Sequence, residues 1–316
     1  MEQQRVSVVI AGVKLDFRLN HKADIESILQ IFRYHSGKYI EGLDYADAHE
    51  IVIQAVEKLP LPEGLPLVWN GFTNIITPLS WYNPVGADEN FILIGNEVLI
   101  RHIPAKNLTY CYLVETKGLY FRKNRPIFSN YSFFLLHSIL AMYGKFCIHA
   151  ACVSRDGKAL LLPARSGEGK TTLCMMLGKA GYEFMGDDLV FISQNAEKEI
   201  IIDSLLCYAK LHDNKSRVKK EIDFIDKFGF NFSYRNKLAA VVKIQKTAVS
   251  ERSYLLEASR QEAFIWLLEA GNNCKILYRV QEWMDICEKT AYLPHYTLLF
   301  GNKGHFDPEL LNSLDL

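Results

Sequence analysis

The first 125 residues consist of short apolar runs, and their pattern predicts a strand-rich region. Runs of β-branched and aromatic residues are separated by Gly, Asn or Pro, which is typical of strands joined by turns. We expect strands over residues 6–11, 13–19, 91–94, 98–100 and 111–115. Apolar positions at helical spacing predict helices over residues 25–32 and 46–58. Residues 1–125 are therefore expected to form a smaller N-terminal α+β domain.

The pattern changes after residue 130, where strand-like and helix-like runs alternate. An apolar run over residues 133–142 predicts a buried helix, because it is too short to span a bilayer. Two strand-like runs, 146–154 and 158–163, flank the dipeptide Asp156-Gly157, which is typical of a β-hairpin turn. We therefore expect residues 130–316 to form a second domain, of the α/β class.

Residues 164–172 read Ala-Arg-Ser-Gly-Glu-Gly-Lys-Thr-Thr, the pattern of a phosphate-binding loop. In such a loop, small residues let successive backbone N–H groups turn inward around a polyphosphate. We expect Lys170 to reach the terminal phosphates and the Thr171 hydroxyl to bind Mg²⁺. A strand is predicted before the loop, and a helix that starts at about Gly169 is predicted after it. The positive end of that helix favours the same anion. The consensus requires Gly at position 164, where this chain has Ala. We therefore expect the loop entrance to be shaped differently.

A pair of carboxylates follows the predicted helix. Gly181 is expected to stop the helix, and the strand-like run 181–192 is interrupted by Asp187 and Asp188, 17 residues after Lys170. Adjacent residues of an extended chain point to opposite sides. One aspartate can then hold Mg²⁺ beside the phosphates while the other accepts a proton from an attacking hydroxyl. Such pairs also occur at turns and strand ends, but this position in an apolar strand favours the functional interpretation.

Composition narrows the classes of partner. Formal net charge is zero, with 36 basic and 36 acidic residues, so no overall field favours nucleic acid or an anionic membrane, and we expect neither as a partner. The polar N-terminus lacks the apolar core of a signal peptide. The seven cysteines are scattered without a C-x-x-C pair, and their odd number argues against a disulfide framework. We expect buried, reduced thiols in a cytoplasmic protein.

The order of these motifs resembles the catalytic domain of HPr kinase/phosphorylase. It is closer to the HPr-kinase-like proteins found beside bacterial modified-peptide operons, such as the kinases of lasso-peptide clusters. The resemblance covers roughly residues 130–192, where His149-Ala-Ala, a hairpin, S-G-E-G-K-T-T-L and G-Y-E-F-M-G-D-D-L follow one another. It implies a P-loop domain of the HPr-kinase/phosphoenolpyruvate-carboxykinase type and a Mg-ATP-dependent kinase that phosphorylates a serine. It also makes self-association an expectation.

The resemblance supplies roles for individual residues. Asp187 is similar to the family's base toward the serine hydroxyl and Asp188 to its metal-side carboxylate, and these two assignments are exchangeable. His149 is similar to a histidine that orients the base or tunes its proton affinity, although a strand-edge histidine bonded to backbone is the alternative. Lys210, in the segment C-Y-A-K-L-H-D, stands where the family has arginine and would stabilise charge on the transferred phosphoryl group. The resemblance also implies that Thr171 binds Mg²⁺, as the second metal ligand.

The nucleotide phosphates are expected to contact the whole loop. The residues assigned to this contact are Arg165, Ser166, Gly167, Glu168, Gly169, Lys170, Thr171 and Thr172.

The acceptor is expected to be a serine of a peptide or small protein, with the N-terminal domain available for its recognition. The chain has no counterpart of the Glu-[Ile/Val]-Arg-Gly-like signature of the bifunctional enzymes, which argues against phosphorylase activity and against HPr as the substrate. Two alternatives stay open: a phosphotransferase acting on a small metabolite, and a module that binds nucleotide or peptide without catalysis.

Overall fold

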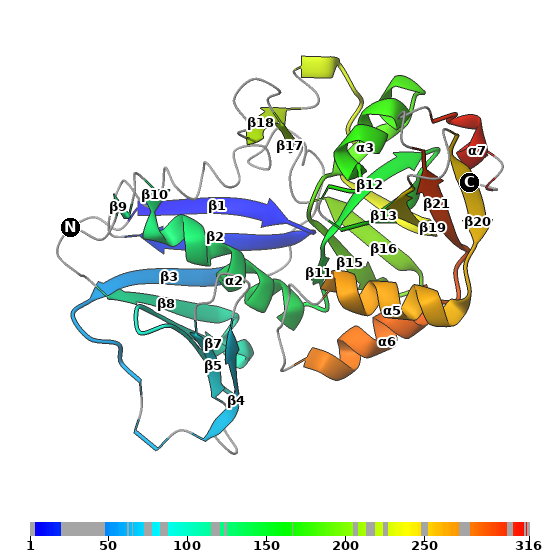
Figure 1. The fold of residues 1–316 in the computed structure, drawn as a ribbon. Coiled ribbons are helices and arrows are strands. Elements are labelled where there is room, and N and C mark those ends of the chain that lie inside the picture. Colours follow the sequence, from blue (N-terminus) through cyan, green and yellow to red (C-terminus); the bar gives the residue numbers. More distant parts are fainter. Residues whose placement is uncertain are drawn as a thin grey trace. The chain divides into compact units, whose positions relative to one another are not determined.

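The chain divides into two compact units, Met1–Tyr143 and Gly144–Leu316, and each has its own large sheet (Figure 1). The structure is a computed structural model. It describes residues 4–19, 48–61, 63–64, 66–72, 78–82, 88–114, 121–122, 125–165, 167–204, 208–212, 219–223, 227–247, 252–271, 279–301, 306–312 and 314. Mixed α/β structure with two large sheets and few helices therefore characterises the described part of the chain.

The first unit holds an eight-stranded mixed sheet in the order β1-β2-β3-β8-β7-β6-β5-β4. Its strands are β1 (Gln4–Ile10), β2 (Val13–Leu19), β3 (His49–Val56), β4 (Leu67–Phe72), β5 (Pro78–Tyr82), β6 (Asn90–Ile94), β7 (Val98–Ile103) and β8 (Leu108–Val114). β3 is parallel to β2 and β8, whereas the other neighbours are antiparallel. All five strands expected in this region are confirmed, as β1, β2, β6, β7 and β8.

The helix expected over residues 46–58 is wrong, because His49–Val56 forms the strand β3. Ile51, Val52 and Ile53 are three consecutive β-branched residues, and all are buried. Two ladders, to β2 and to β8, supply the backbone hydrogen bonds of this strand. Pairing and burial in the sheet outweigh the helical spacing of the apolar positions. The helix expected over residues 25–32 lies outside the described residues.

The apolar run before residue 143 forms the helix α2 (Ile127–Met142), which confirms the helix expected there. Its contacts place it in the first unit, where it touches β7 and β10, although the sequence assigned residues from 130 onward to the second domain. Short elements complete this unit: η1 (Pro104–Lys106), β9 (Phe121–Arg122) and β10 (Arg125–Pro126). No helix that the structure describes is long and apolar enough to cross a membrane.

The second unit is built on a sheet in the order β11-β15-β16-β19-β13-β12-β14, to which β21 and β20 are attached through β19. Its strands are β11 (Phe146–Ile148), β12 (Ala150–Arg155), β13 (Lys158–Pro163), β14 (Glu183–Gly186), β15 (Val190–Gln194), β16 (Ile200–Ser204), β19 (Arg235–Lys246), β20 (Tyr254–Glu257) and β21 (His295–Phe300). β17 (Tyr208–His212) and β18 (Lys219–Asp223) form a separate pair. The helices are α3 (Lys170–Lys179), α5 (Arg260–Gly271), α6 (Val280–Thr290) and α7 (Glu309–Asn312).

The hairpin expected before the phosphate loop is confirmed by the pairing of β12 with β13. Arg155 pairs with Lys158, so Asp156 and Gly157 form a two-residue turn. Their φ angles are 51° and 76°, which is the conformation of the turns that best join twisted strands. β13 also pairs in parallel with β19, and five of its six residues are buried. α3 lies on one side of this sheet, and α5 and α6 on the other (Figure 1).

The end of α3 confirms Gly181 as the helix stop. Gly181 has a φ of 91°, its N–H donates to Gly178 O, and the N–H of Tyr182 donates to Leu177 O. These two bonds form a Schellman motif, which requires a left-handed residue after the helix. Leu173 and Leu177 are fully buried against the sheet, so the helix that begins at the phosphate loop is anchored by a continuous core.

Five cysteines fall within the described residues: Cys111, Cys147, Cys152, Cys174 and Cys287. All five are free and buried, which is the state expected for them. Burial raises the pKa of the Cys152 and Cys287 thiols.

Two buried histidines in the first unit share one hydroxyl. His49 Nε2 and His102 Nδ1 each lie 2.8 Å from Thr109 Oγ1, and His49 Nδ1 lies 3.0 Å from the Tyr143 hydroxyl oxygen. A hydroxyl has one hydrogen, so Thr109 donates to one imidazole and accepts from the other, which suits two neutral rings. Burial lowers the pKa of His49 to about 4. Burial and the nearby His49 lower that of His102 to about 3.

We predict that this pair makes the first unit unstable in acid. Because the folded pKa values lie below the ordinary value of 6.5, the unfolded chain binds more protons. The free energy of unfolding is therefore unaffected by the titration of these two histidines above about pH 6.5. It decreases as the pH falls toward 4, by up to about 1.4 kcal/mol per pH unit for each histidine. Urea unfolding of the wild type and of His102→Leu across this range measures the effect, and the variant should show the smaller pH slope. Equal slopes would exclude a contribution from His102.

Candidate functional site

The phosphate-loop sequence connects the end of β13 to the start of α3, so the strand–loop–helix order expected from the sequence is confirmed. Gly167 and Gly169 have φ angles of 88° and 100°, a region that residues with a Cβ rarely adopt. Gly169 is the N-cap residue of α3. Both glycines are therefore needed for the path of the loop into the helix. Ser166 lies outside the described residues.

Ala164 fits the loop without the left-handed backbone that a glycine would offer. The φ angle of Ala164 is not positive, and its side chain packs against the core between α3 and the sheet. Its carbonyl oxygen accepts a hydrogen bond from Lys170 Nζ at 2.8 Å. The departure from the glycine consensus therefore requires no left-handed backbone at this position.

Lys170 and His149 lie side by side beneath the loop. The Lys170 side chain is 5% exposed, and its Nζ lies 3.4 Å from His149 Nε2. An ammonium group only donates hydrogen bonds, so this contact requires Nε2 to be the acceptor and the imidazole proton to sit on Nδ1. The backbone N–H of His149 donates to Ala270 O, one of the last carbonyls of α5. The fold thus brings His149 to the loop lysine.

Thr171 and Asp187 are joined by a short hydrogen bond. Thr171 Oγ1 donates to Asp187 Oδ2 at 2.6 Å. Asp187 is 8% exposed, and its Oδ1 has no hydrogen-bond partner among the described residues. Burial raises the pKa of Asp187 to about 6; the charge of Asp188 adds to this increase, while the Thr171 bond and Lys170 oppose it. The carboxylate is therefore a buried charge that the protein compensates only in part.

A magnesium ion fits this arrangement. The hydroxyl of Thr171 and the carboxylate of Asp187 are oxygen donors of the type that Mg²⁺ prefers. Mg²⁺ commonly takes only one or two protein ligands and completes its shell with waters and substrate phosphates. The buried Oδ1 without a hydrogen-bond partner is the atom whose charge such an ion would neutralise.

The two aspartates lie in a bend between β14 and β15, which corrects the expectation that they interrupt one extended strand. Asp188 has a φ of 68°, so the pair does not alternate across a pleated strand. Asp188 is half-buried, whereas Asp187 is buried. The preceding Gly186 has no room for a side chain, because a Cβ there would lie 2.9 Å from Val190 Cγ1 and 3.2 Å from Leu189 O.

This bend lies where one antiparallel ladder opens. Ile148 of β11 pairs with Val190 of β15, and Cys152 of β12 pairs with Gly186 of β14, in the same register. Among the described residues no ladder pair falls between these two. The interval holds His149 on one strand and the Asp187–Asp188 bend on the other. The gap in the ladder therefore holds one buried aspartate, Asp187, together with the partly buried His149 and Asp188.

The other loop residues form its outer side. The Arg165 N–H donates to Glu168 Oε2 at 2.7 Å, and the Glu168 N–H donates to Arg165 O at 3.2 Å. The Arg165 amide thus binds a carboxylate in this structure, which shows that it is oriented toward an anionic oxygen. Thr172 is exposed in the first turn of α3.

Lys210 lies on β17, opposite Glu221 of β18 in the ladder register. β17 contacts α3, the helix that follows the phosphate loop. This places the strand that carries Lys210 next to that helix, and the role of its side chain stays a prediction.

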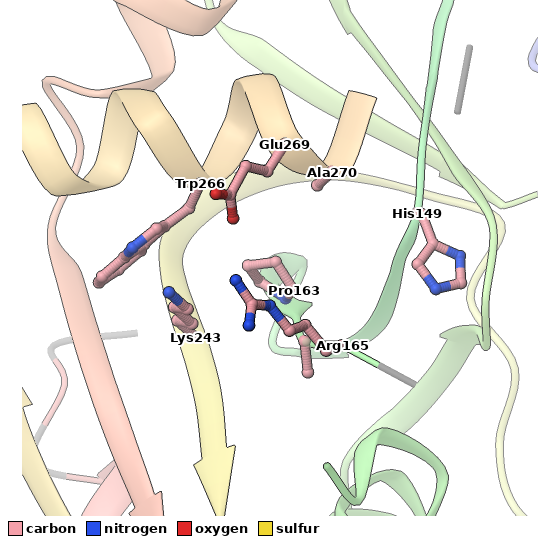
Figure 2. A pocket seen from close by; sticks show the side chains of 8 residues that line it. His149, Pro163, Arg165, Lys243, Trp266, Glu269 and Ala270 are labelled. Carbon is pink, nitrogen blue, oxygen red and sulfur yellow. The ribbon is translucent and has the colours of Figure 1, made fainter. Parts of the chain in front are cut away.

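A pocket of about 120 Å³ adjoins the loop on the side of α5, and we call it the α5 pocket. It is lined by His149, Pro163, Ala164, Arg165, Lys243, Trp266, Glu269 and Ala270 (Figure 2). Lys243 comes from β19, and its Nζ lies 4.6 Å from the centre of the Trp266 ring. The pocket therefore joins the first residues of the loop to the helix on the opposite side of the sheet from α3.

Lys243, Trp266 and Glu269 are not among the site residues predicted from the sequence. Trp266 is buried and also forms a wall of the α5 pocket. A signal was present, because Lys243 follows five apolar residues, 238–242, and precedes the buried Ile244 in the middle of β19. A charged residue in such a run is costly unless its head group meets a partner or solvent.

Comparison with known proteins shows little sequence similarity. No protein-family model and no curated protein sequence matches this chain. Among solved structures, the HPr(Ser) kinase/phosphatase from Coxiella burnetii is similar over 53% of this chain and 92% of that chain, with 13% sequence identity and a TM-score of 0.33. The function proposed below therefore rests on the residues of this chain.

We predict that Asp187→Asn stabilises the protein in the absence of nucleotide and Mg²⁺. The amide keeps an acceptor for Thr171 but removes a buried charge, so the free energy of unfolding at pH 7 should rise by on the order of 1 kcal/mol. Urea denaturation in EDTA measures the change. Asp188→Asn, at a half-buried position, is the matched control and should change stability less. A loss of stability in Asp187→Asn would show instead that the protein's own cations compensate the charge.

Proposed function

We propose that this protein is a Mg-ATP-dependent kinase that transfers the γ-phosphoryl group to a hydroxyl, most simply a serine of a peptide or small protein. One observation carries the proposal, and it is the set of groups gathered at the end of β13. Gly167 and Gly169 bend the loop there, and Lys170 lies buried beside it. The hydroxyl of Thr171 donates a hydrogen bond to Asp187. These are the parts that a phosphate-binding loop and its metal-side carboxylate require.

The phosphate-binding part consists of the loop, Lys170 and the start of α3. The ammonium of Lys170 is held at Ala164 O and can turn from this carbonyl to a phosphate oxygen. The first backbone N–H groups of α3 have no partner within the helix and lie at its positive end. Together these groups stabilise negative charge, and no covalent intermediate is required.

Of the two exchangeable aspartate assignments, the hydrogen bond between Thr171 and Asp187 favours Asp187 as the metal-side carboxylate. Mg²⁺ would then be held by Thr171 and Asp187, and when bound it neutralises charge on the phosphates. Asp188, which is half-buried, is left for the base. It accepts the proton of the acceptor hydroxyl as the hydroxyl oxygen bonds to the γ-phosphorus and the bond from that phosphorus to ADP breaks.

His149 is proposed to act through Lys170. In the neutral form required by the 3.4 Å contact, its Nε2 helps to hold the ammonium under the loop. A protonated imidazole would repel the ammonium, so the protonation of His149 would affect phosphate binding. This differs from the role implied by the resemblance, in which the histidine orients or tunes the base.

The serine acceptor is supported by the sequence resemblance to HPr-kinase-like proteins, and recognition of a peptide by the first unit is part of the same proposal. A metabolite acceptor and a non-catalytic nucleotide-binding protein are the alternatives, and the experiments below separate them.

Mg-ATP should stabilise the wild-type protein against heat, and Lys170→Ala should abolish this effect. Ligand at a hundred times its Kd adds up to about 2.7 kcal/mol of stability by mass action. Differential scanning fluorimetry with ATP, Mg²⁺, both and neither measures the shift. Lys179→Ala, in the last turn of the same helix, is the matched control and should behave as wild type. If Lys170→Ala retained the full shift, the phosphate site would lie elsewhere.

Phosphoryl transfer should be impaired in both Asp187→Asn and Asp188→Asn, but through different steps. Asp188→Asn should keep the Mg-dependent stabilisation by ATP but lower kcat by about 10²–10⁴, the usual contribution of a general base. Asp187→Asn should weaken the dependence on Mg²⁺ itself, so the Mg²⁺ concentration for half-maximal transfer should rise. Phosphate transfer from labelled ATP to serine peptides and to metabolite extracts provides the readout. The reverse pattern in the two variants would restore the original assignment of Asp187 as the base.

A further inference from the structure

We propose that the α5 pocket binds a carboxylate that the phosphate acceptor carries close to its hydroxyl. This inference rests on the proposed function, and it names the class of acceptor. A group in this pocket is next to the phosphate loop, because Pro163, Ala164 and Arg165 belong to both. His149 also lines the pocket while its Nε2 contacts Lys170.

The charges of the pocket favour an anion. Arg165 and Lys243 supply two cations and Glu269 one carboxylate, and Figure 2 shows the three side chains around one space. Within the described part of the chain, none of the three has an ion-pair partner. The lining is thus positive overall. The charge of Lys243 also acts on the Glu262 carboxylate, and its Nζ lies over the Trp266 ring, so Arg165 and Lys243 together supply the positive charge available to a ligand. A guanidinium and an ammonium together are well suited to a carboxylate, since charge-assisted hydrogen bonds are stronger than neutral ones.

The same lining does not suit a nucleobase. A base usually stacks on an open aromatic face, but Trp266 is 8% exposed and Lys243 lies over its ring. The volume of about 120 Å³ is below the range of roughly 300–1,000 Å³ for pockets that enclose a drug-sized ligand. The pocket therefore admits a group the size of a side chain, with the rest of the ligand outside.

Glu269 adds a second requirement. The carboxylate of Glu269 lowers the affinity of the pocket for multiply charged anions, because it repels them. It can also accept a hydrogen bond from an N–H group of the ligand. A group with one negative charge and a nearby N–H meets both conditions. An acidic residue beside the acceptor serine has this chemistry, and so does a small amino acid that bears the hydroxyl itself.

Two matched pairs of ligands test the inference. The first is a pair of short peptides with one serine and either Glu or Gln beside it. The second is L-serine and L-serinamide. Isothermal titration calorimetry with the full chain, Mg²⁺ and a non-hydrolysable ATP analogue measures binding without requiring transfer. In at least one pair, we expect the ligand with the carboxylate to bind about tenfold more tightly than its neutral amide counterpart. The pair that shows this difference identifies the source of the carboxylate.

Three variants link the discrimination to the pocket. Lys243→Met keeps an apolar stem against Trp266 but removes the charge, and it should abolish the preference for the acid. Glu269→Gln should increase that preference, an effect that a loss of packing would not produce. Lys246→Met, at an exposed position of the same strand, is the control and should match the wild type.

The outcomes separate this inference from the kinase proposal. The inference is overturned if the acid and its neutral amide bind equally in both pairs. It is also overturned if Lys243→Met keeps the wild-type preference for the acid, even where ATP binds and transfer occurs. Weaker binding of the ATP analogue to Lys243→Met, with acceptor discrimination intact, also overturns it and assigns the pocket to the nucleotide. Discrimination that depends on Lys243 in a protein that fails to bind Mg-ATP supports the carboxylate site and contradicts the kinase proposal.

Discussion

The position of β13 constrains the geometry of the whole candidate site. This strand lies between β12 and β19 and is covered by helices on both sides, so its end has little freedom. The chain leaves it through a loop that two left-handed glycines turn into α3. Leu173 and Leu177 then anchor the helix in the core. Lys170 and Thr171 are therefore placed by packing that begins several residues away, which is how a rigid scaffold positions a functional loop.

The second constraint is electrostatic. Asp187 is buried with one oxygen bonded to Thr171 and the other without a partner among the described residues. Such a group costs stability unless a cation compensates it. The raised pKa of this carboxyl is a direct result of its burial. A buried carboxylate of this kind is better explained by a bound cation than by structural stability.

Local sequence patterns predicted the elements around the loop and five strands of the first unit, but they did not predict β3. The turn at Asp156-Gly157, the start of α3 and its stop at Gly181 all follow from neighbouring residues, because turn and cap conformations depend on short-range sterics and hydrogen bonds. The segment 46–58 failed because its strand is stabilised by ladders to β2 and β8, which are distant in sequence from one another. Its apolar spacing alone could not reveal those partners.

The sequence by itself predicted the hairpin, the loop after it and the helix that follows, and it marked the two aspartates as candidate site residues. Each depends on residue types within a few positions along the chain. Only the tertiary structure decided that Thr171 meets Asp187, that His149 lies against Lys170, and that Lys243, Trp266 and Glu269 surround a pocket beside the loop. These contacts join α3, the bend between β14 and β15, the residue between β11 and β12, β19 and α5, and they depend on the order in which strands pair. Pairing order is set by packing across the whole sheet, which local sequence does not encode.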